Sequence, residues 1–275
     1  MPAGLPLLLL DRERPTGPFQ PDWGLHPSVV VGTVLLGALY VWGITAARRR
    51  WRLSDSPPEP WRILCFAGAL LTLLLSLNGP VHDLSDYYLF SAHMFQHLVL
   101  TLLFPPLLIA GIPGWLLSPV LRRHPGAARA GRLLTRPLVA AILFTVTITI
   151  WHVVTFYELM MRDHDVHILT HILFMVSAVI MWWPVMSPVP EVPRLSEGPA
   201  MLYLFLVSIP MQLVAALISL ADDPLYLWYV DAPRTWGLSP LDDQKFGGLM
   251  MWVPANLWIF GAIAILFFRW AKREA

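Results

Sequence analysis

The chain has 275 residues, of which 56% are hydrophobic and 13% charged, and its formal net charge is +1. A soluble core of this length does not need so much apolar sequence, so the composition indicates a polytopic membrane protein and no nucleic-acid partner. A single cysteine, Cys65, excludes disulfides, CxxC redox chemistry and thiolate-cluster metal sites.

Residues 1–27 are expected to form an external N-terminal tail. The tail opens with MPAGLPLLLLDRER, which contains a short apolar run. No basic residue precedes this run and no small-residue cleavage site follows it, so a cleaved signal peptide is not expected.

Seven apolar segments follow, each close to the length of about 20 residues that crosses a bilayer. They are expected at residues 28–46, 62–79, 88–110, 137–157, 167–186, 200–220 and 247–268. The longest connection, 221–246, is rich in Trp and Tyr and is expected to hold a short re-entrant or interfacial piece. The predicted fold class is therefore all-α: one seven-transmembrane-helix bundle over 28–268, followed by a short tail at 269–275.

The distribution of basic residues predicts the orientation of the bundle. With the N-terminus outside, 14 of the 19 Lys and Arg residues fall on the cytoplasmic side, as the positive-inside rule requires. We therefore expect the N-terminus outside and the C-terminus in the cytoplasm. Of the 18 acidic residues, 13 then lie on the outer side, Asp86 and Asp243 among them, where they would attract cations or simply be solvated.

Five of the nine histidines fall at a similar depth near the outer ends of three predicted spans. His93 with His97, and His167 with His171, are spaced four apart, which places each pair on one helix face. The span that carries His152 runs in the opposite direction and brings this residue to a matching depth. Ionisable groups inside a membrane usually mark a functional site. We therefore expect these five imidazoles to converge on a metal ion, whereas His26, His82, His124 and His164 are expected only to form hydrogen bonds or to be solvated.

Imidazole ligands suit copper, zinc, nickel and iron. The three histidine-bearing spans contain no carboxylate at the histidine depth, which disfavours calcium, magnesium and a carboxylate-bridged di-iron centre. Thioethers would favour Cu(I), although methionine in an apolar span usually serves packing; the candidates are Met94, Met211, Met250 and Met251. Copper is therefore the expected ion.

Two alternatives stay open at this point. His97 and His171 on facing helices could be the axial ligands of a heme in a b-type electron carrier, and the protein could instead be a copper permease. The sequence contains no HExxH, no GxSxG and no phosphate-binding glycine loop. An enzymatic activity is therefore not expected.

Four segments carry a resemblance to a known family. They are SAHMFQHLVLTLLFPPLLIAGIP, WHVVTFYE, HILTHILFMVSAVIMWWPV and DDQKFGGLMMW. In combination they resemble the polytopic CtaG-like cytochrome c oxidase assembly factors of bacteria that have caa-type oxidases. The unrelated single-span copper chaperone of the same name uses cysteine ligands, which this chain cannot supply.

The resemblance implies a multi-pass protein of the bacterial plasma membrane that matures a heme-copper oxidase. Its partners would be the lipid bilayer, the catalytic subunit of the oxidase and an extracytoplasmic copper chaperone. The five histidines named above would handle copper. Asp243 and Gln244 match an acidic-glutamine step before paired glycines in the family, and we expect them to support a histidine ligand indirectly, with Gly247 and Gly248 allowing close helix approach.

Overall fold

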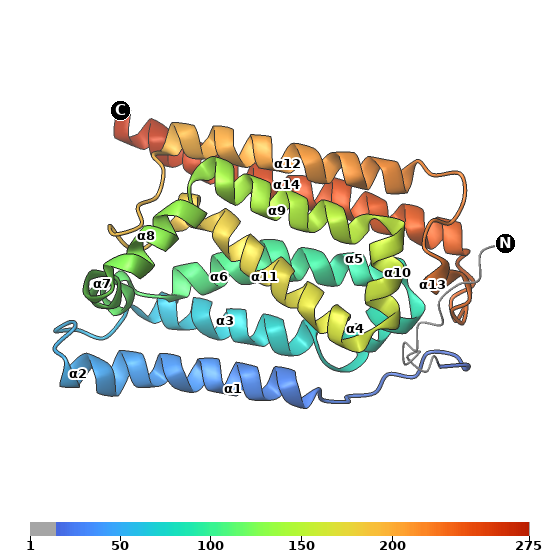
Figure 1. The fold of residues 1–275 in the computed structure, drawn as a ribbon, viewed down its shortest axis with the longest axis horizontal. Coiled ribbons are helices and arrows are strands. Elements are labelled where there is room, and N and C mark those ends of the chain that lie inside the picture. The colour runs from blue at the N-terminus through green and yellow to red at the C-terminus, as the bar shows by residue number, and fades with distance from the viewer. Residues whose placement is uncertain (1–14, 275) are drawn as a thin grey trace.

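The structure is a computed structural model, and it describes residues 15–274. Residues 1–14, which carry most of the expected external tail and the expectation about a signal peptide, lie outside the described residues. Within the described range every regular element is helical, and the long helices run side by side along the longest axis of the molecule (Figure 1). This confirms the all-α class.

The elements in chain order are α1 (Pro27–Trp42), η1 (Gly43–Ala47), α2 (Arg48–Arg50), α3 (Pro60–Ser76), α4 (Gly79–Asp83), η2 (Leu84–Tyr88), α5 (Phe90–Leu98), η3 (Val99–Leu103), α6 (Phe104–Gly111), α7 (Gly114–Arg123), α8 (Pro125–Leu134), α9 (Pro137–His152), α10 (Val154–Arg162), α11 (His164–Met186), α12 (Glu197–Ser219), α13 (Leu227–Val230) and α14 (Pro240–Glu274). The three η elements are single π-helical stretches.

Five to seven parts of the described chain are long and apolar enough to cross a membrane. Five are single helical runs: Pro27–Arg50, Phe90–Gly111, His164–Met186, Glu197–Ser219 and Pro240–Glu274. Two more qualify only if a bent pair counts as one span: Pro60–Ser76 with Gly79–Tyr88, bent by 55°, and Pro125–Leu134 with Pro137–His152, bent by 67°. The seven predicted spans are therefore the upper limit of this range.

The predicted fourth span, 137–157, is too long as a single helix. Helix α9 ends at His152, Val153 is extended with ψ 128°, and α10 begins at Val154. A helix end leaves carbonyl groups without a partner in the helix. Here the Tyr226 hydroxyl donates to the His152 carbonyl over 2.9 Å, so a side chain from a distant loop supports the break.

The two ends of the bundle differ in chemistry. Helices α4, α10 and α13 lie at one end, and α2, α7 and α8 lie at the other (Figure 1). We call these the histidine end and the arginine end. The arginine end carries Arg48–Arg50 on α2, Arg122 and Arg123 on α7, and Arg129 and Arg132 on α8. Most basic residues therefore lie away from the histidine cluster, as the sequence predicted, although Arg162 lies on α10 at the histidine end and His124 lies between α7 and α8 at the arginine end.

Helix α14 packs along α12 and α5, while α11 packs against α9 and α6, and α1 contacts the rest of the bundle mainly through α3. Large apolar side chains on the outer faces of these helices stay exposed, for example Leu138 at 72%, Leu217 at 72% and Leu257 at 68%. Burying such a side chain away from water is worth about 1.5–3 kcal/mol. A bilayer would supply that burial, which supports the membrane assignment.

A π-helical stretch interrupts the third span directly after the histidine pair. Pro105 has no N–H and cannot bond the Thr101 carbonyl four residues earlier. The Trp182 indole of α11 donates to that carbonyl instead, over 3.0 Å, and the Thr101 hydroxyl donates to the His97 carbonyl over 2.7 Å. The irregular backbone is thus satisfied by side chains, which is the condition for tolerating it inside a membrane.

The connection 221–246 contains the short helix α13, but its aromatic residues do not all lie at a lipid interface as expected. Tyr226, Trp228 and Tyr229 are only 1–3% exposed. Trp236, in contrast, is 50% exposed. These three residues fold inward over the histidine end, which does not fit an interfacial piece and leaves the re-entrant alternative as a prediction.

Candidate metal centre

The five imidazoles predicted to converge lie together inside the histidine end. Helix α5 contributes His93 and His97, α9 contributes His152, and α11 contributes His167 and His171; all five are 0–7% exposed. Ring centroids lie 4.2 Å apart for His93 and His97 and 4.5 Å apart for His167 and His171. Between helices the spacings are 5.5 Å for His93 and His167, 5.6 Å for His97 and His171, and 6.0 Å for His97 and His152.

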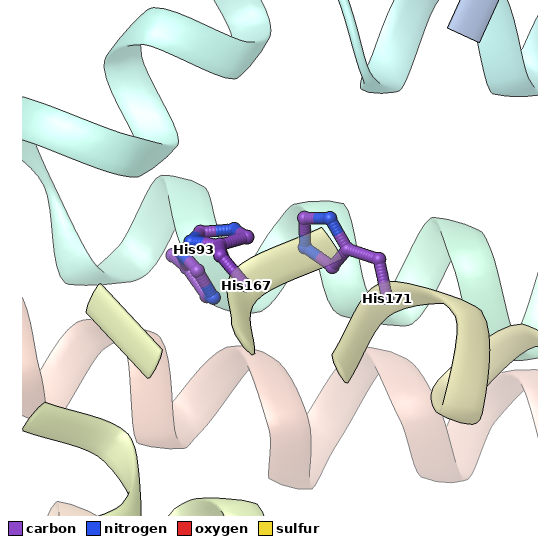
Figure 2. Close-up of side chains that lie close together, drawn as sticks. All are labelled: His93, His167 and His171. Carbon is purple, nitrogen blue, oxygen red and sulfur yellow. The ribbon is translucent and has the colours of Figure 1, made fainter. Parts of the chain in front are cut away.

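Three of the five form the tightest group. His93, His167 and His171 each offer a ring nitrogen, and these nitrogens all lie within 4.8 Å of one another. Figure 2 shows the two α11 imidazoles beside that of His93. Two imidazole nitrogens bound to one ion at about 2.0–2.1 Å are at most about 4 Å apart. Small side-chain rotations would therefore bring this triad to ligand distance.

Hydrogen bonds orient two of the rings so that one nitrogen faces inward. The Nδ1 atom of His93 lies 3.3 Å from the Ser85 carbonyl, and Nδ1 of His152 lies 2.7 Å from the Ile148 carbonyl. Because a carbonyl only accepts, both Nδ1 atoms donate, which leaves Nε2 with its lone pair. Metal-binding histidines are commonly held in this way by their other nitrogen.

Several of these nitrogens are buried without a hydrogen-bond partner among residues 15–274. They are Nε2 of His93, Nε2 of His152 and both ring nitrogens of His97. A buried polar atom without a partner costs about 1–3 kcal/mol, and such atoms in a native interior require an explanation. Several of them in one cluster fit ligand atoms whose partner is a cation.

Asp86 is a member of this cluster that the sequence did not predict. It was expected on the outer side, where acids would attract cations or be solvated; its side chain is fully buried, so the solvated alternative is wrong for this residue. Its carboxylate oxygens lie 3.4 Å from Nε2 of His82 and 3.6 Å from Nε2 of His167. The argument that no carboxylate lies near the histidines held only for their own three helices, because Asp86 comes from η2. The spacing of His82 and Asp86, four residues apart, was a signal for this pairing.

His82 is likewise built into the cluster rather than solvated. The Gln96 side-chain amide donates to the Ser76 carbonyl over 2.6 Å and lies 3.2 Å from Nδ1 of His82. An amide NH₂ group only donates, so Nδ1 accepts and Nε2 carries the proton toward Asp86. This residue therefore forms the hydrogen bonds that were expected of it, and in addition faces a buried carboxylate.

Asp243 and Gln244 support the site through the backbone. Asp243 accepts from the Phe90 and Ser91 backbone N–H groups over 2.8 and 3.2 Å and from the Ser91 hydroxyl over 2.6 Å. A carboxylate at this position caps α5, whose first turn leads into His93. Gln244 accepts from the Leu225 N–H over 2.6 Å, and it thereby holds the segment that leads into α13.

The inward-folded aromatic residues close the histidine end. The Trp228 indole donates to the Asp86 carbonyl over 2.6 Å, and the Tyr229 hydroxyl donates to the Ser85 carbonyl over 2.5 Å. Both bonds hold η2, the element that presents Asp86 and bonds His93. Loop 221–246 is thus a cover that fixes the position of the site.

Toward the arginine end the core below the histidines is mostly apolar, and its buried Thr101 and Ser177 hydroxyls donate to backbone carbonyls. Phe174 contacts the His97 ring with centroids 4.6 Å apart, and Ala178, Met181 and Trp182 continue the same core along α11. Met94, Met211 and Met251 also belong to the central apolar cluster. Packing therefore explains these three methionines without a role as metal ligands.

Comparisons with known proteins cover the part of the chain that forms the histidine cluster. The model of the cytochrome c oxidase caa3 assembly factor family matches residues 38–273. Uncharacterized proteins of Mycobacterium bovis and Mycobacterium tuberculosis are each 25% identical over 268 residues, and one of Mycobacterium leprae is 23% identical over the same length. Each alignment covers 92% of this chain but only 40% of the relative, so the chain spans less than half of their length. No solved structure matches. Since the family match covers nearly the whole helical bundle and every histidine of the cluster, the chain belongs to the cytochrome c oxidase caa3 assembly factor family.

Proposed function

We propose that this protein binds a copper ion at its buried histidine cluster and supplies it to the catalytic subunit of a caa3-type cytochrome c oxidase, without itself catalysing a reaction. One observation carries the proposal. Five imidazoles from three helices meet in one buried place, and several of their nitrogens lack hydrogen-bond partners among the described residues.

The arrangement favours a compact ion over a heme. His93 with His97, and His167 with His171, are in edge-to-face contact at 4.2 and 4.5 Å between centroids. Neighbouring rings from the two helices follow at 5.5–5.6 Å. A porphyrin needs an open slot between its two axial ligands, whereas a single ion needs only the small gap between ring nitrogens.

Copper is favoured among compact ions because the ligand set is dominated by imidazoles and the family serves a copper-containing oxidase. Asp86 adds a carboxylate at the edge of the set, which also suits zinc and iron. Metal analysis therefore has to identify the ion as well as count it.

We propose that delivery to the oxidase takes place at the extracytoplasmic side. Basic residues gather at the arginine end, and by the positive-inside rule that end faces the cytoplasm. The apolar core below the histidines supports a site that is loaded and emptied from one side rather than a transport path. An extracytoplasmic copper chaperone is a suitable donor for such a site.

Metal analysis and an optical spectrum of the detergent-purified full chain test the proposal. We expect the wild type to retain copper after dialysis, and the double variant His93→Ala plus His171→Ala to lose it. His164→Ala is the matched control, because His164 lies on α11 only three residues before His167 but is exposed. We expect this control to retain copper like the wild type.

The other outcomes reject the proposal in distinct ways. A Soret band in the visible spectrum would establish a heme protein instead. Equal copper in the wild type and in the double variant would show that the cluster is not the binding site. Retention of zinc or iron in place of copper, from a medium that contains all three, would overturn the choice of metal.

A further inference from the structure

His26, at the entrance to α1, is held against the buried cluster by a defined set of contacts. Its backbone N–H donates to the Asn78 side-chain oxygen over 2.7 Å. Two residues earlier, the Gly24 carbonyl accepts from the Gly79 N–H over 3.0 Å. Gly79 has a positive φ of 62°, and a Cβ there would lie 2.9 Å from the Trp23 ring. The segment before α1 is thus seated on the turn between α3 and α4.

From His26 a continuous file of side chains leads inward. The rings of His26 and His82 lie 4.4 Å apart between centroids, in edge-to-face contact. The Asp86 carboxylate then bridges His82 and His167, at 3.4 and 3.6 Å from their Nε2 atoms. His167 belongs to the inner triad with His93 and His171. Each potential ligand therefore lies next to another, from the edge of the protein to the cluster.

Differences in exposure and charge along this file indicate the end at which a cation would enter. His26 is partly exposed, whereas His82, Asp86 and His167 are buried. Asp83 is close enough to Asp22, His82 and Asp86 for their charges to interact. Acidic groups near the outer end of the file raise the local concentration of cations. A cation would meet the outer end of the file first.

We infer that His26, His82 and Asp86 form an outer cation-binding site through which copper reaches the inner histidine cluster. The inference rests on the proposed function and extends it with a loading route. Because Nε2 of His82 carries a proton toward Asp86, His82 offers an ion the lone pair of Nδ1 once the Gln96 amide turns away. The ion can then move along the file by exchanging one ligand at a time, so it is never stripped of all its ligands in the low-dielectric interior. The Gln96 side-chain oxygen, which is buried and has no hydrogen-bond partner among the described residues, adds a donor atom on the residue that already holds His82.

The test measures how fast purified full-length protein takes up copper(I) presented as its bathocuproine disulfonate complex, whose absorbance falls as the ion is removed. The variants are His26→Gln, which changes a partly exposed side chain and preserves the packing, and His26→Gln plus His82→Gln. His164→Ala is again the control. We expect both variants to load more slowly by about tenfold or more, with the final occupancy of the inner cluster unchanged.

Three outcomes separate the two proposals. Slow loading to an undiminished end point supports the outer site. Loading of both variants at the rate of the His164→Ala control overturns the outer site and leaves the inner one standing. A wild type that removes no copper from the complex overturns the proposed function, and the loading route with it.

Discussion

At the scale of single residues, Asp243 shows how a side chain far along the chain supports the histidine helix. It lies on the first turn of α14 and caps α5 through the Phe90 and Ser91 backbone. The negative charge also faces the positive end of the α5 dipole. This one carboxylate thereby ties the last helix of the chain to the helix that presents His93 and His97.

Replacing Asp243 by alanine removes this cap and leaves the Ser91 hydroxyl without its acceptor. We expect the variant to lose about 0.5–2 kcal/mol of unfolding free energy, measured as a lower thermal midpoint by tryptophan fluorescence in detergent. Asp242→Ala is the control, since Asp242 is exposed and, among residues 15–274, bonds only its local turn through Ser239. Equal midpoints for the two variants would contradict the capping role.

A second residue-scale effect concerns pH at the arginine end. The Ser118 hydroxyl donates to the Glu191 carboxylate over 2.6 Å and, with Arg122 nearby at 3.3 Å, holds the pKa of Glu191 below its ordinary value of 4.5. A carboxyl group whose pKa is lower in the folded state stabilises the fold above its unfolded pKa. That contribution is lost as the pH falls through the folded pKa.

Ser118→Ala removes the main cause of this shift in pKa. We expect the thermal midpoint of the variant to fall less steeply than that of the wild type between pH 6 and about pH 3, because less of its stability depends on the ionised carboxylate. Thermal melts across this pH range provide the measurement. Parallel curves would show that the bond from Ser118 does not shift the Glu191 pKa.

At the scale of elements, paired glycines set the distance between α14 and its neighbours. A Cβ at Gly247 would lie 2.5 Å from the Phe90 ring, and one at Gly248 would lie 2.4 Å from the Ser219 hydroxyl oxygen and 2.9 Å from the Ser219 nitrogen. The sequence predicted that these two positions allow close helix approach, and the contacts confirm it. Close approach in turn brings Asp243 to the start of α5.

Gly248→Ala should push α14 away from α12. We expect a loss of about 1–3 kcal/mol of unfolding free energy from overpacking, measured as a lower thermal midpoint. Gly261→Ala on the same helix is the matched control, because a Cβ at Gly261 meets nothing within 4 Å. That control is expected to be neutral or to gain up to about 1 kcal/mol, since alanine favours a helix over glycine. Similar losses in both variants would contradict the packing explanation.

Two elements show why local sequence did not predict every helix boundary. The segment around Val153 contains no Pro or Gly, so a single span over 137–157 was the natural prediction. The break there is supported by Tyr226 from loop 221–246, a contact that no local pattern reveals. In the third span, by contrast, Pro105 and Pro106 are visible helix breakers, but Trp182, which bonds the Thr101 carbonyl there, lies 81 residues from Thr101.

At the scale of the whole molecule, the separation of basic residues from histidines leads to a test of orientation. Cys65 is the only cysteine, so Cys65→Ser provides a background for single-cysteine labelling. In that background we compare His164→Cys at the histidine end with Arg123→Cys at the arginine end, both at exposed positions.

A membrane-impermeant maleimide applied to intact cells should label position 164 and should label position 123 only after the cells are opened. The reason is that the positive-inside rule places the arginine end in the cytoplasm. Labelling is read as a mass shift of the purified protein. The reverse pattern would place the histidine cluster on the cytoplasmic side and would overturn delivery to the outer face of an oxidase.

The sequence by itself determined the helical class and the five histidines whose imidazoles meet. It also determined the apolar spans, except for the bends within two of them. These properties follow from local patterns in the sequence. An apolar stretch of about 20 residues indicates a span, and a spacing of four residues indicates a shared helix face. Only the tertiary structure decided that Asp86 is buried, that His26 and His82 extend the cluster, and that Trp228 and Tyr229 cover it. Those positions depend on contacts between elements distant in the chain, where burial is set by what packs above a residue rather than by its neighbours in sequence.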